Sequence, residues 1–433
     1  MKDSIKFAEE LIDFCYQSPT AYHAVDTTKK LLLAENFVEL DENKSWKLKA
    51  GGKYFFCRND SALVAFIVGK NKPDQSGFKI VGAHTDSPGF RVKPAPEMVS
   101  EGKYLKLNTE VYGGPILNTW LDRPLSIAGR VVLKGKNVMR PSTKLVKIEK
   151  PICIIPNISV HMNPEVNSGF ALNKQNDTLP FLGIINDRLT QDNYLINLVA
   201  AELKVKPEEI MDFDLFLFDF QKGCLTGANQ ELVSAGRIDD LASVHSGICA
   251  LSAQKKPKST CVMVCFDNEE VGSSTMMGAD SQILASALER IVLATGGNRE
   301  EYFRALAVSY LVSADGAHAV HPNMGGKCDP TSRPSVNGGL VIKMSANKSY
   351  TSDGKSSAIF AQICEEAGVK TQRFVNRSDM RGGSTIGPIS ATHVSIASVD
   401  VGIPMLSMHS IRELCGVEDL VAMYRALQQF FTY

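Results

Sequence analysis

The 433 residues of this chain are enough for about two or three domains. Hydrophobic residues make up 44% of the sequence and charged residues 22%, which is typical of a soluble globular protein. The 47 Lys and Arg residues balance the 47 Asp and Glu residues. This balance excludes a global positive field of the kind that attracts nucleic acids or anionic lipid surfaces.

The N-terminal segment 1–17 is charged and amphipathic, and it lacks the apolar core and cleavage site of a signal peptide. No apolar run approaches the ~18 residues that a membrane span needs. The ten cysteines are scattered without a CxxC pair, and most lie inside apolar runs, so we expect reduced, buried thiols. We therefore expect a cytoplasmic protein that binds neither nucleic acid nor membrane.

Hydrophobic patterns predict strands and helices that alternate along much of the chain. In chain order they predict a strand over 78–84, a β-rich region over 97–227, a helix over 239–253, a strand over 261–266, a strand over 338–347, a helix over 356–368, strands over 373–378 and 393–402, and a helix over 417–431. The alternation favours a layered α/β domain with helices on both faces of its sheet.

The region 97–227 differs from the rest of the chain, because β-branched runs and turns dominate it and a polar loop covers 161–177. We interpret it as a mostly β domain inserted into the α/β domain. The predicted division is 1–96 plus 228–433 for the α/β domain and 97–227 for the insertion.

Two adjacent glutamates, Glu269 and Glu270, follow the apolar run 261–266. Adjacent carboxylates repel each other, and like charges in one site raise the pKa of one of them. Such a pair is kept more easily where a cation lies against one member and the other acts as a base. An acidic loop after a strand is the competing interpretation of this stretch.

Four further segments carry candidate ligands at or near the ends of apolar runs. They are GAHTDSPG with His84 and Asp86, GRIDDLASVHS with Asp239 or Asp240, LVSADGAHAVHPN with Asp315, His318 and His321, and MLSMHSIREL with His409. Residues two apart in a strand face the same side, so Asp86 can orient the ring of His84. Taken singly, a polar turn explains the first segment and a helix N-cap the second.

Together these segments supply two histidines, a bridging Asp, one further Asp, one further Glu and a spare Glu. That set suffices for two divalent cations about 3.5–4 Å apart with a carboxylate base beside them. Nitrogen and oxygen ligands without thiolate suit Zn²⁺, and also Mn²⁺ or Co²⁺.

The same segments resemble motifs of the aspartyl aminopeptidase family of cocatalytic, dinuclear zinc metallopeptidases. The resemblance is carried by SPTAYHAV, VGAHTDSPG, LNTEVYGGPILNTWLDRPLSIAGRV, GRIDDLASVHS, CFDNEEVGS, VSADGAHAVHPN, RSDMRGGSTIGPI and LSMHSIREL. It runs from about residue 4 to residue 433 and keeps the order of the segments. It implies a layered αβα metallopeptidase domain interrupted by a β-rich insertion that mediates dimer contacts.

The resemblance assigns five metal ligands. His84 and Asp315 would hold one metal, Glu270 and His409 the other, and Asp239 would bridge the two.

The resemblance also assigns roles around the metals. Asp86 would support the first histidine ligand, and Glu269 would be the general base and acid. His161, in the insertion of a neighbouring subunit, would contact substrate and stabilise the oxyanion. His318 and Lys343 match positions that contact substrate, although a structural Asp or Glu would also serve as the anionic partner of Lys343.

The implied activity is removal of the N-terminal residue, Asp or Glu by the family name, from short peptides with a free N-terminus. The family also forms homo-oligomers as large as tetrahedral dodecamers. Two alternatives stay open. A related dinuclear carboxypeptidase or deacylase would use the same metals with a clamp for a substrate carboxylate, and a non-catalytic scaffold protein would have lost ligands that this chain keeps.

Overall fold

A computed structural model describes residues 2–186, 189, 193–380 and 382–433. The chain forms two compact units. Unit 1 comprises Met1–Asp86, Gly223–Met408 and Glu413–Tyr433, and unit 2 comprises Ser87–Lys222 and His409–Arg412. The domain boundaries given above, near 96 and 228, stay a prediction.

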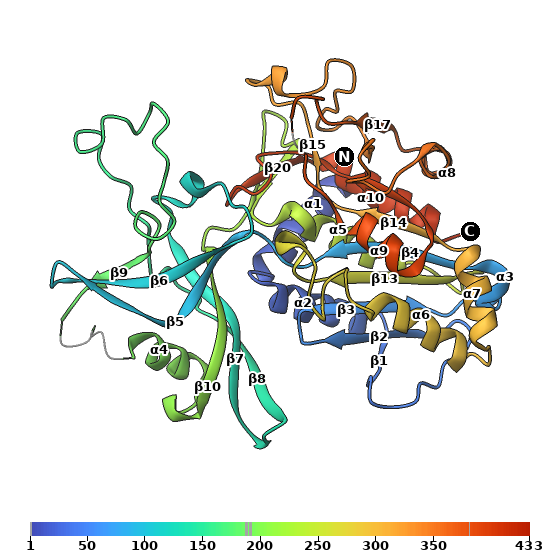
Figure 1. The fold of residues 1–433 in the computed structure, drawn as a ribbon, viewed down its shortest axis with the longest axis horizontal. Coiled ribbons are helices and arrows are strands. Elements are labelled where there is room, and N and C mark those ends of the chain that lie inside the picture. Colours follow the sequence, from blue (N-terminus) through green and yellow to red (C-terminus); the bar gives the residue numbers. More distant parts are fainter. Residues whose placement is uncertain (1, 187–188, 190–192, 381) are drawn as a thin grey trace. The chain divides into compact units, whose positions relative to one another are not determined.

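Unit 1 is built on a nine-stranded mixed sheet (Figure 1). Its strands, in spatial order, are β1 (Val38–Glu39), β2 (Lys53–Arg58), β3 (Ala62–Ile67), β13 (Thr260–Phe266), β4 (Phe78–His84), β14 (Tyr310–Ala314), β18 (Ala397–Gly402), β16 (Leu340–Lys343) and β17 (Thr371–Phe374). The four central strands, from β13 to β18, run parallel. Their carboxyl ends therefore lie along one edge of the sheet, where open α/β sheets usually bind ligands.

Helices pack on both faces of this sheet. They are α1 (Lys2–Gln17), α2 (Ala21–Ala34), α3 (Pro73–Ser76), α5 (Ile238–Ser252), α6 (Ile283–Ala294), α7 (Arg299–Ala307), α8 (Gly354–Glu366), α9 (Ile386–Val394) and α10 (Val417–Phe430), with short 3-10 turns at Glu269–Val271 and Gly325–Lys327. Among the described residues, no helix combines the length and apolarity needed to cross a membrane.

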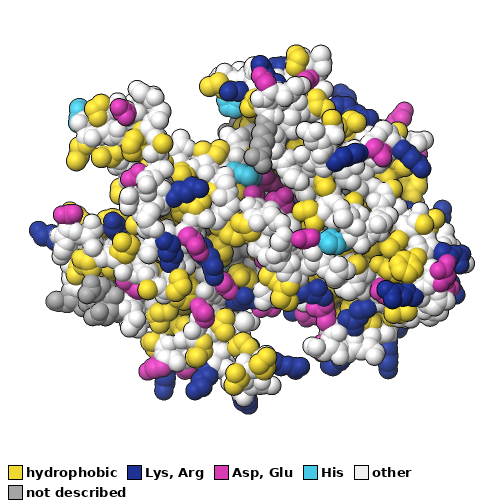
Figure 2. All heavy atoms as spheres, in the orientation of Figure 1, with side chains coloured by type: hydrophobic (Ala, Val, Ile, Leu, Met, Phe, Trp, Pro, Cys, Tyr) yellow, Lys and Arg dark blue, Asp and Glu magenta, His cyan; other side chains and the backbone are white. Residues whose placement is uncertain are grey.

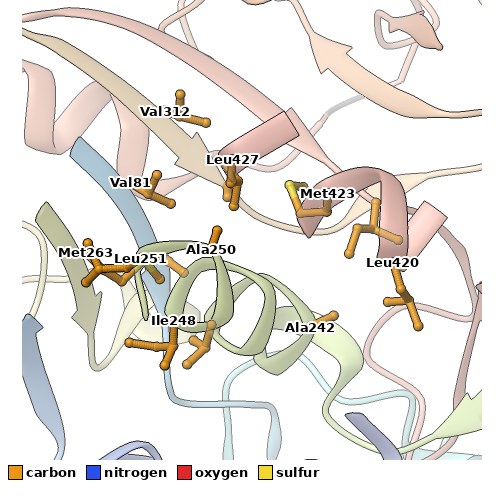
Figure 3. Close-up of a cluster of buried hydrophobic side chains, with 14 of the residues drawn as sticks. Val81, Ala242, Ile248, Ala250, Leu251, Met263, Val312, Leu420, Met423 and Leu427 are labelled. Atoms are coloured by element: carbon orange, nitrogen blue, oxygen red, sulfur yellow. The ribbon is translucent and has the colours of Figure 1, made fainter. Parts of the chain in front are cut away.

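Alternate residues of the central strands feed two separate hydrophobic cores, as the pleat of a strand requires. Val81 of β4 and Met263 of β13 belong to the core shared with α5 and α10. Figure 3 shows these two side chains beside Ile248 and Leu251 of α5. The neighbouring Ile80 points to the opposite face, in the core formed with α6 and α9. The central strands are thus buried on both faces, which explains their continuous apolar sequences.

A smaller five-stranded sheet completes unit 1. Its order is β11 (Cys224–Thr226), β12 (Leu232–Ala235), β20 (Glu413–Gly416), β19 (Pro404–Leu406) and β15 (Ala317–His318).

Unit 2 contains a six-stranded antiparallel sheet. Its order is β8 (Arg140–Lys147), β7 (Leu125–Asn137), β10 (Ile210–Asp219), β5 (Gly89–Ser100), β6 (Tyr104–Tyr112) and β9 (Phe181–Ile184). Unit 2 also holds α4 (Tyr194–Leu203) and the 3-10 turns Leu117–Trp120 and Pro207–Glu209. Phe90, Leu107, Leu125 and Leu215 anchor its separate core.

The predicted fold class is confirmed, and most differences concern the ends of elements. The predicted strand over 393–402 begins too early, because Thr385 caps α9 by accepting the N–H of Gly387 and the helix runs to Val394. The strand predicted over 338–347 is limited to Leu340–Lys343, and the one predicted over 373–378 ends at Phe374.

Charged side chains of both signs are scattered over the face of the molecule seen in Figure 2. This distribution agrees with the equal numbers of acidic and basic residues in the sequence.

The buried His245 makes the stability of the fold depend on pH. His245 of α5 is 4% exposed, and its ring centroid lies 4.9 Å from that of Phe7 and 5.4 Å from that of Phe14. Burial lowers the pKa of His245 to about 4. A histidine in an unfolded chain has a pKa of about 6.5. Between about pH 6.5 and about pH 4 the unfolded chain therefore binds a proton at His245 more readily than the folded chain does. Stability is retained above about pH 6.5 and is lost as the pH falls toward about 4.

We predict that His245→Leu flattens the pH dependence of stability. Between pH 7 and pH 4 the native chain should lose up to about 3 kcal/mol more unfolding free energy than the variant. Urea unfolding at both pH values measures this difference. The control is His321→Leu, at an exposed histidine, which should keep the native slope. Equal slopes for all three proteins would contradict the prediction.

Candidate metal centre

His84 is the last residue of β4, and it is almost completely buried. Its Nδ1 lies 3.1 Å from the backbone oxygen of Asp86 and 3.4 Å from Oδ1 of the same residue. Its Nε2 lies 3.4 Å from Oδ1 of Asp239 and 3.7 Å from Oδ1 of Asp315. Asp86 therefore holds one side of the ring, and the other nitrogen faces two carboxylates.

His84, Asp239 and Asp315 form a buried cluster in which one ligand atom from each lies within 4.8 Å of the others. His84 ends β4, and Asp315 directly follows β14, the parallel neighbour of β4. Asp239 stands at the start of α5, where it and Asp240 have non-helical dihedral angles, so the regular turns begin after them. The sheet edge and the helix start together bring the three side chains into one place.

The glutamate pair joins this cluster through the backbone. The N–H groups of Glu269 and Glu270 donate to Oδ1 and Oδ2 of Asp86, each at 3.1 Å. Ligand atoms of the two glutamates and of His84 also lie within 4.8 Å of one another. One carboxylate therefore fixes both the histidine ring and the turn that carries the glutamates.

The pKa values in the cluster move in different directions. Burial raises the pKa of Glu269 to about 8, and the charges of Asp315 and Glu270 add to this effect against the opposing effect of His84. Burial acts against a charge on Asp315 as well, but Lys343 and His84 hold its pKa well below the ordinary value.

The pKa of His84 is raised, whereas burial alone would lower the pKa of an imidazole. Burial disfavours its charged form, but hydrogen bonds that the ring donates to the carboxylates of Asp239, Asp315 and Asp86 raise its pKa well above the usual range. A histidine that ligates a metal must be neutral, so a cation held by His84 would displace a proton from this site.

Lys343, at the end of β16, lies beside the cluster. Its Nζ is 3.2 Å from Oδ2 of Asp315 and donates to the backbone oxygen of Gly316 at 2.9 Å.

Two further buried acids support the cluster, namely Asp240, which the sequence offered only as an alternative ligand to Asp239, and Glu413, which it did not single out. Oδ2 of Asp240 accepts the backbone N–H of His84 at 3.1 Å, and Oε2 of Glu413 accepts the backbone N–H of Asp239 at 3.0 Å. The adjacency of Asp240 to Asp239 was a usable signal. Glu413 gave none, because it lies 174 residues from its partner and reaches it through the smaller sheet.

The remaining predicted site residues are His318, His161 and His409. His318 is exposed at the end of β15, with its ring centroid 5.9 Å from that of Phe374. His161 is an exposed residue of unit 2. His409 begins the segment His409–Arg412, also of unit 2, and its Nδ1 lies 3.1 Å from the backbone oxygen of Gly114. The functional roles of all these residues stay predictions.

The donor set of the cluster fits a divalent cation. It offers an imidazole nitrogen and several carboxylate oxygens, which are ligands that Zn²⁺ accepts. Its possible ligands include the acidic side chains of Asp239, Asp315, Glu269 and Glu270, and Lys343 lies beside Asp315. Cations would relieve the repulsion among these carboxylates.

Comparisons with known proteins agree with this chemistry. The profile of a family described as aminopeptidase I zinc metalloprotease (M18) matches residues 14–431. A probable M18 family aminopeptidase 2 from Clostridium novyi (strain NT) is 58% identical over 431 residues, covering 100% of both chains. The cryo-EM structure of an Ape4 and Nbr1 complex matches with a TM-score of 0.95 and 34% identity over 99% of this chain and 86% of that one. The mApe1 dodecamer of S. cerevisiae matches with a TM-score of 0.85 and 29% identity over 98% and 96% of the two chains.

We predict that Asp86→Ala weakens zinc binding by about 10- to 100-fold, the usual cost of losing a group that orients a metal ligand. The variant removes the acceptor of two backbone N–H groups and a contact of the His84 ring. Competition with a chromophoric chelator, using metal-stripped protein, measures the affinity. The control is Asp41→Ala, because Asp41 is an exposed residue that also accepts a backbone N–H. Equal zinc affinity in both variants would refute the supporting role of Asp86.

Proposed function

Because this chain belongs to the aminopeptidase I zinc metalloprotease family (M18), we propose that it removes the N-terminal residue of short peptides at the cluster around His84. The chain is thus an aminopeptidase, and the proposal concerns its site and its substrates. The observation that carries it is the buried convergence of His84, Asp239 and Asp315, with Glu269 and Glu270 held beside them by Asp86.

Two divalent ions are the proposed cofactors, with zinc as the first choice and manganese or cobalt as alternatives. His84 and Asp315 would hold one ion, Glu270 and His409 the other, and Asp239 both. When bound, such ions lower the pKa of a shared water and polarise the carbonyl of the scissile peptide.

Glu269 is the proposed general base and acid. It would take the proton of the attacking water and pass it to the leaving amine. Burial favours this work, because it raises the pKa of Glu269 to about 8. Bound cations would act in the opposite direction and lower this pKa. A carboxyl group with a pKa near the working pH can both accept and return a proton.

Recognition of an acidic N-terminal residue is the finer part of the proposal. His318 is its candidate contact, and His161 from a neighbouring subunit is the candidate donor to the oxyanion. A free α-amine would distinguish the peptide substrate from the blocked substrates of a deacylase. The cytoplasmic location expected from the sequence stays a prediction.

We predict that Glu269→Gln lowers kcat by about 10²- to 10⁴-fold, the usual share of a general base, while bound zinc is retained. The assay follows release of the first residue from Asp-, Glu- and Leu-peptides, with and without a chelator. Glu418→Gln, at an exposed glutamate, should keep native activity. Chelation should abolish release in every active protein, and added zinc should restore it.

Three outcomes would count against the proposal. Release that resists chelation would exclude the metal mechanism. Turnover of N-acetylated peptides alone would favour the deacylase. Clear preference for Leu over Asp and Glu would exclude the acidic specificity while leaving the aminopeptidase activity in place.

A closed homo-oligomer is the proposed assembly, since dodecamers occur among the similar structures. We predict that light scattering in line with gel filtration gives a particle of about twelve times the chain mass of 47.2 kDa. A stable monomer with full peptidase activity would contradict this assembly.

A further inference from the structure

We propose that Lys343 is a positioning residue for Asp315 and does not recognise the acidic substrate side chain. In this role its ammonium group holds Oδ2 of Asp315 and keeps Oδ1 turned toward His84 and the cation. The inference rests on the proposed function only in taking Asp315 as a metal ligand.

The first argument is that the ammonium group is buried and fully engaged. Lys343 is 2% exposed. A lysine ammonium has three N–H donors. One faces Oδ2 of Asp315 at 3.2 Å, and one faces the backbone oxygen of Gly316 at 2.9 Å. The Nζ atom also lies 5.3 Å from the centroid of the Tyr350 ring, within range of a cation–π contact. The surroundings thus satisfy the charge without any substrate.

The second argument concerns the other buried acid near this lysine. Asp400 lies opposite Lys343 in the antiparallel pair of β16 and β18. Its carboxylate accepts hydrogen bonds from the hydroxyl groups of Ser313 and Thr385 and from the backbone N–H of Thr351. Asp400 is therefore hydrogen-bonded to three neighbouring segments. The ion pair of Lys343 is formed with Asp315.

The third argument is that the two carboxylate oxygens of Asp315 face different groups. Oδ2 lies against Lys343, and Oδ1 lies 3.7 Å from Nε2 of His84. The backbone N–H of Asp315 is bonded to the oxygen of Val401, which fixes the main chain. The lysine then fixes the side chain, so a single oxygen is presented to the cluster. A ligand held in this way loses little freedom when it binds a cation.

A consequence for specificity follows. An acidic substrate side chain could attract this ammonium group only by competing with Asp315 for it. If Lys343 serves Asp315, discrimination between Asp- and Leu-peptides depends on other residues.

The test compares Lys343→Met with the native chain. Methionine keeps much of the length of the apolar stem and removes the charge. We expect zinc affinity of the metal-stripped protein to fall by about 10- to 100-fold, measured by chelator competition. With zinc at saturation, the ratio of kcat/KM for Asp- and Leu-peptides should stay within about threefold of the native ratio. Lys348→Met, at an exposed lysine, is the matched control and should change neither quantity.

A double variant isolates the pathway through Asp315. If Lys343 acts through that carboxylate, adding Lys343→Met to Asp315→Asn should weaken zinc binding by less than about threefold further, as coupled residues do. Lys343→Arg keeps a charge with a different donor geometry, so it should fold even if the methionine variant does not. Its zinc affinity should lie between those of the native and methionine proteins.

The proposal is overturned if Lys343→Met or Lys343→Arg binds zinc as the native chain does while the preference for Asp-peptides collapses. That result would assign the lysine to the substrate. Absence of peptide turnover in the native chain would count against the proposed function, whereas the zinc measurements test the positioning role without requiring activity.

Discussion

The parallel pairing of β13, β4 and β14 is the constraint on which the site depends. Parallel neighbours place their carboxyl ends at the same edge of a sheet. The residues that leave these ends are the glutamate pair, His84 with Asp86, and Asp315, from segments that are far apart in the sequence. The polar groups of the site are thus concentrated where the strands end.

Asp86 converts this shared edge into a fixed geometry. Its two carboxylate oxygens accept one N–H each from Glu269 and Glu270, and its backbone oxygen meets the ring of His84. Both donors belong to the 3-10 turn Glu269–Val271, so Asp86 ties this turn to the end of β4. A buried carboxylate that accepts two backbone donors gains charge-assisted hydrogen bonds, which are stronger than neutral ones. The geometry of the site therefore depends on Asp86 as well as on the candidate metal ligands.

Sequence reasoning named the candidate ligands for a physical reason. Each candidate stands at the end of an apolar run, and such positions can be recognised without knowledge of the fold, as for His84 and Asp315. It could not find Glu413, which supports Asp239 across 174 residues through a strand pairing that no local pattern encodes. It also extended the strand before Ala397 into α9, because β-branched residues at a helix end resemble the start of a strand.

The partner of Lys343 is a second feature that could not be predicted from the sequence. A lone cation among apolar residues predicts an anionic partner, but the sequence leaves open whether that partner is substrate or protein. Only the register of β16 beside β18, and of β18 beside β14, brings the lysine to the residue after β14, which is Asp315. Tertiary pairing decides this question, and the spacing of residues does not.

The two kinds of carboxylate in the cluster follow from these surroundings. Burial alone would raise the pKa of every acid in it. Lys343 and His84 reverse this effect at Asp315, which therefore stays ionised, whereas at Glu269 burial prevails and the pKa rises to about 8. Acids whose pKa values are driven apart take different roles. The ionised one suits a permanent metal ligand, and the one that titrates near neutrality suits the transfer of protons.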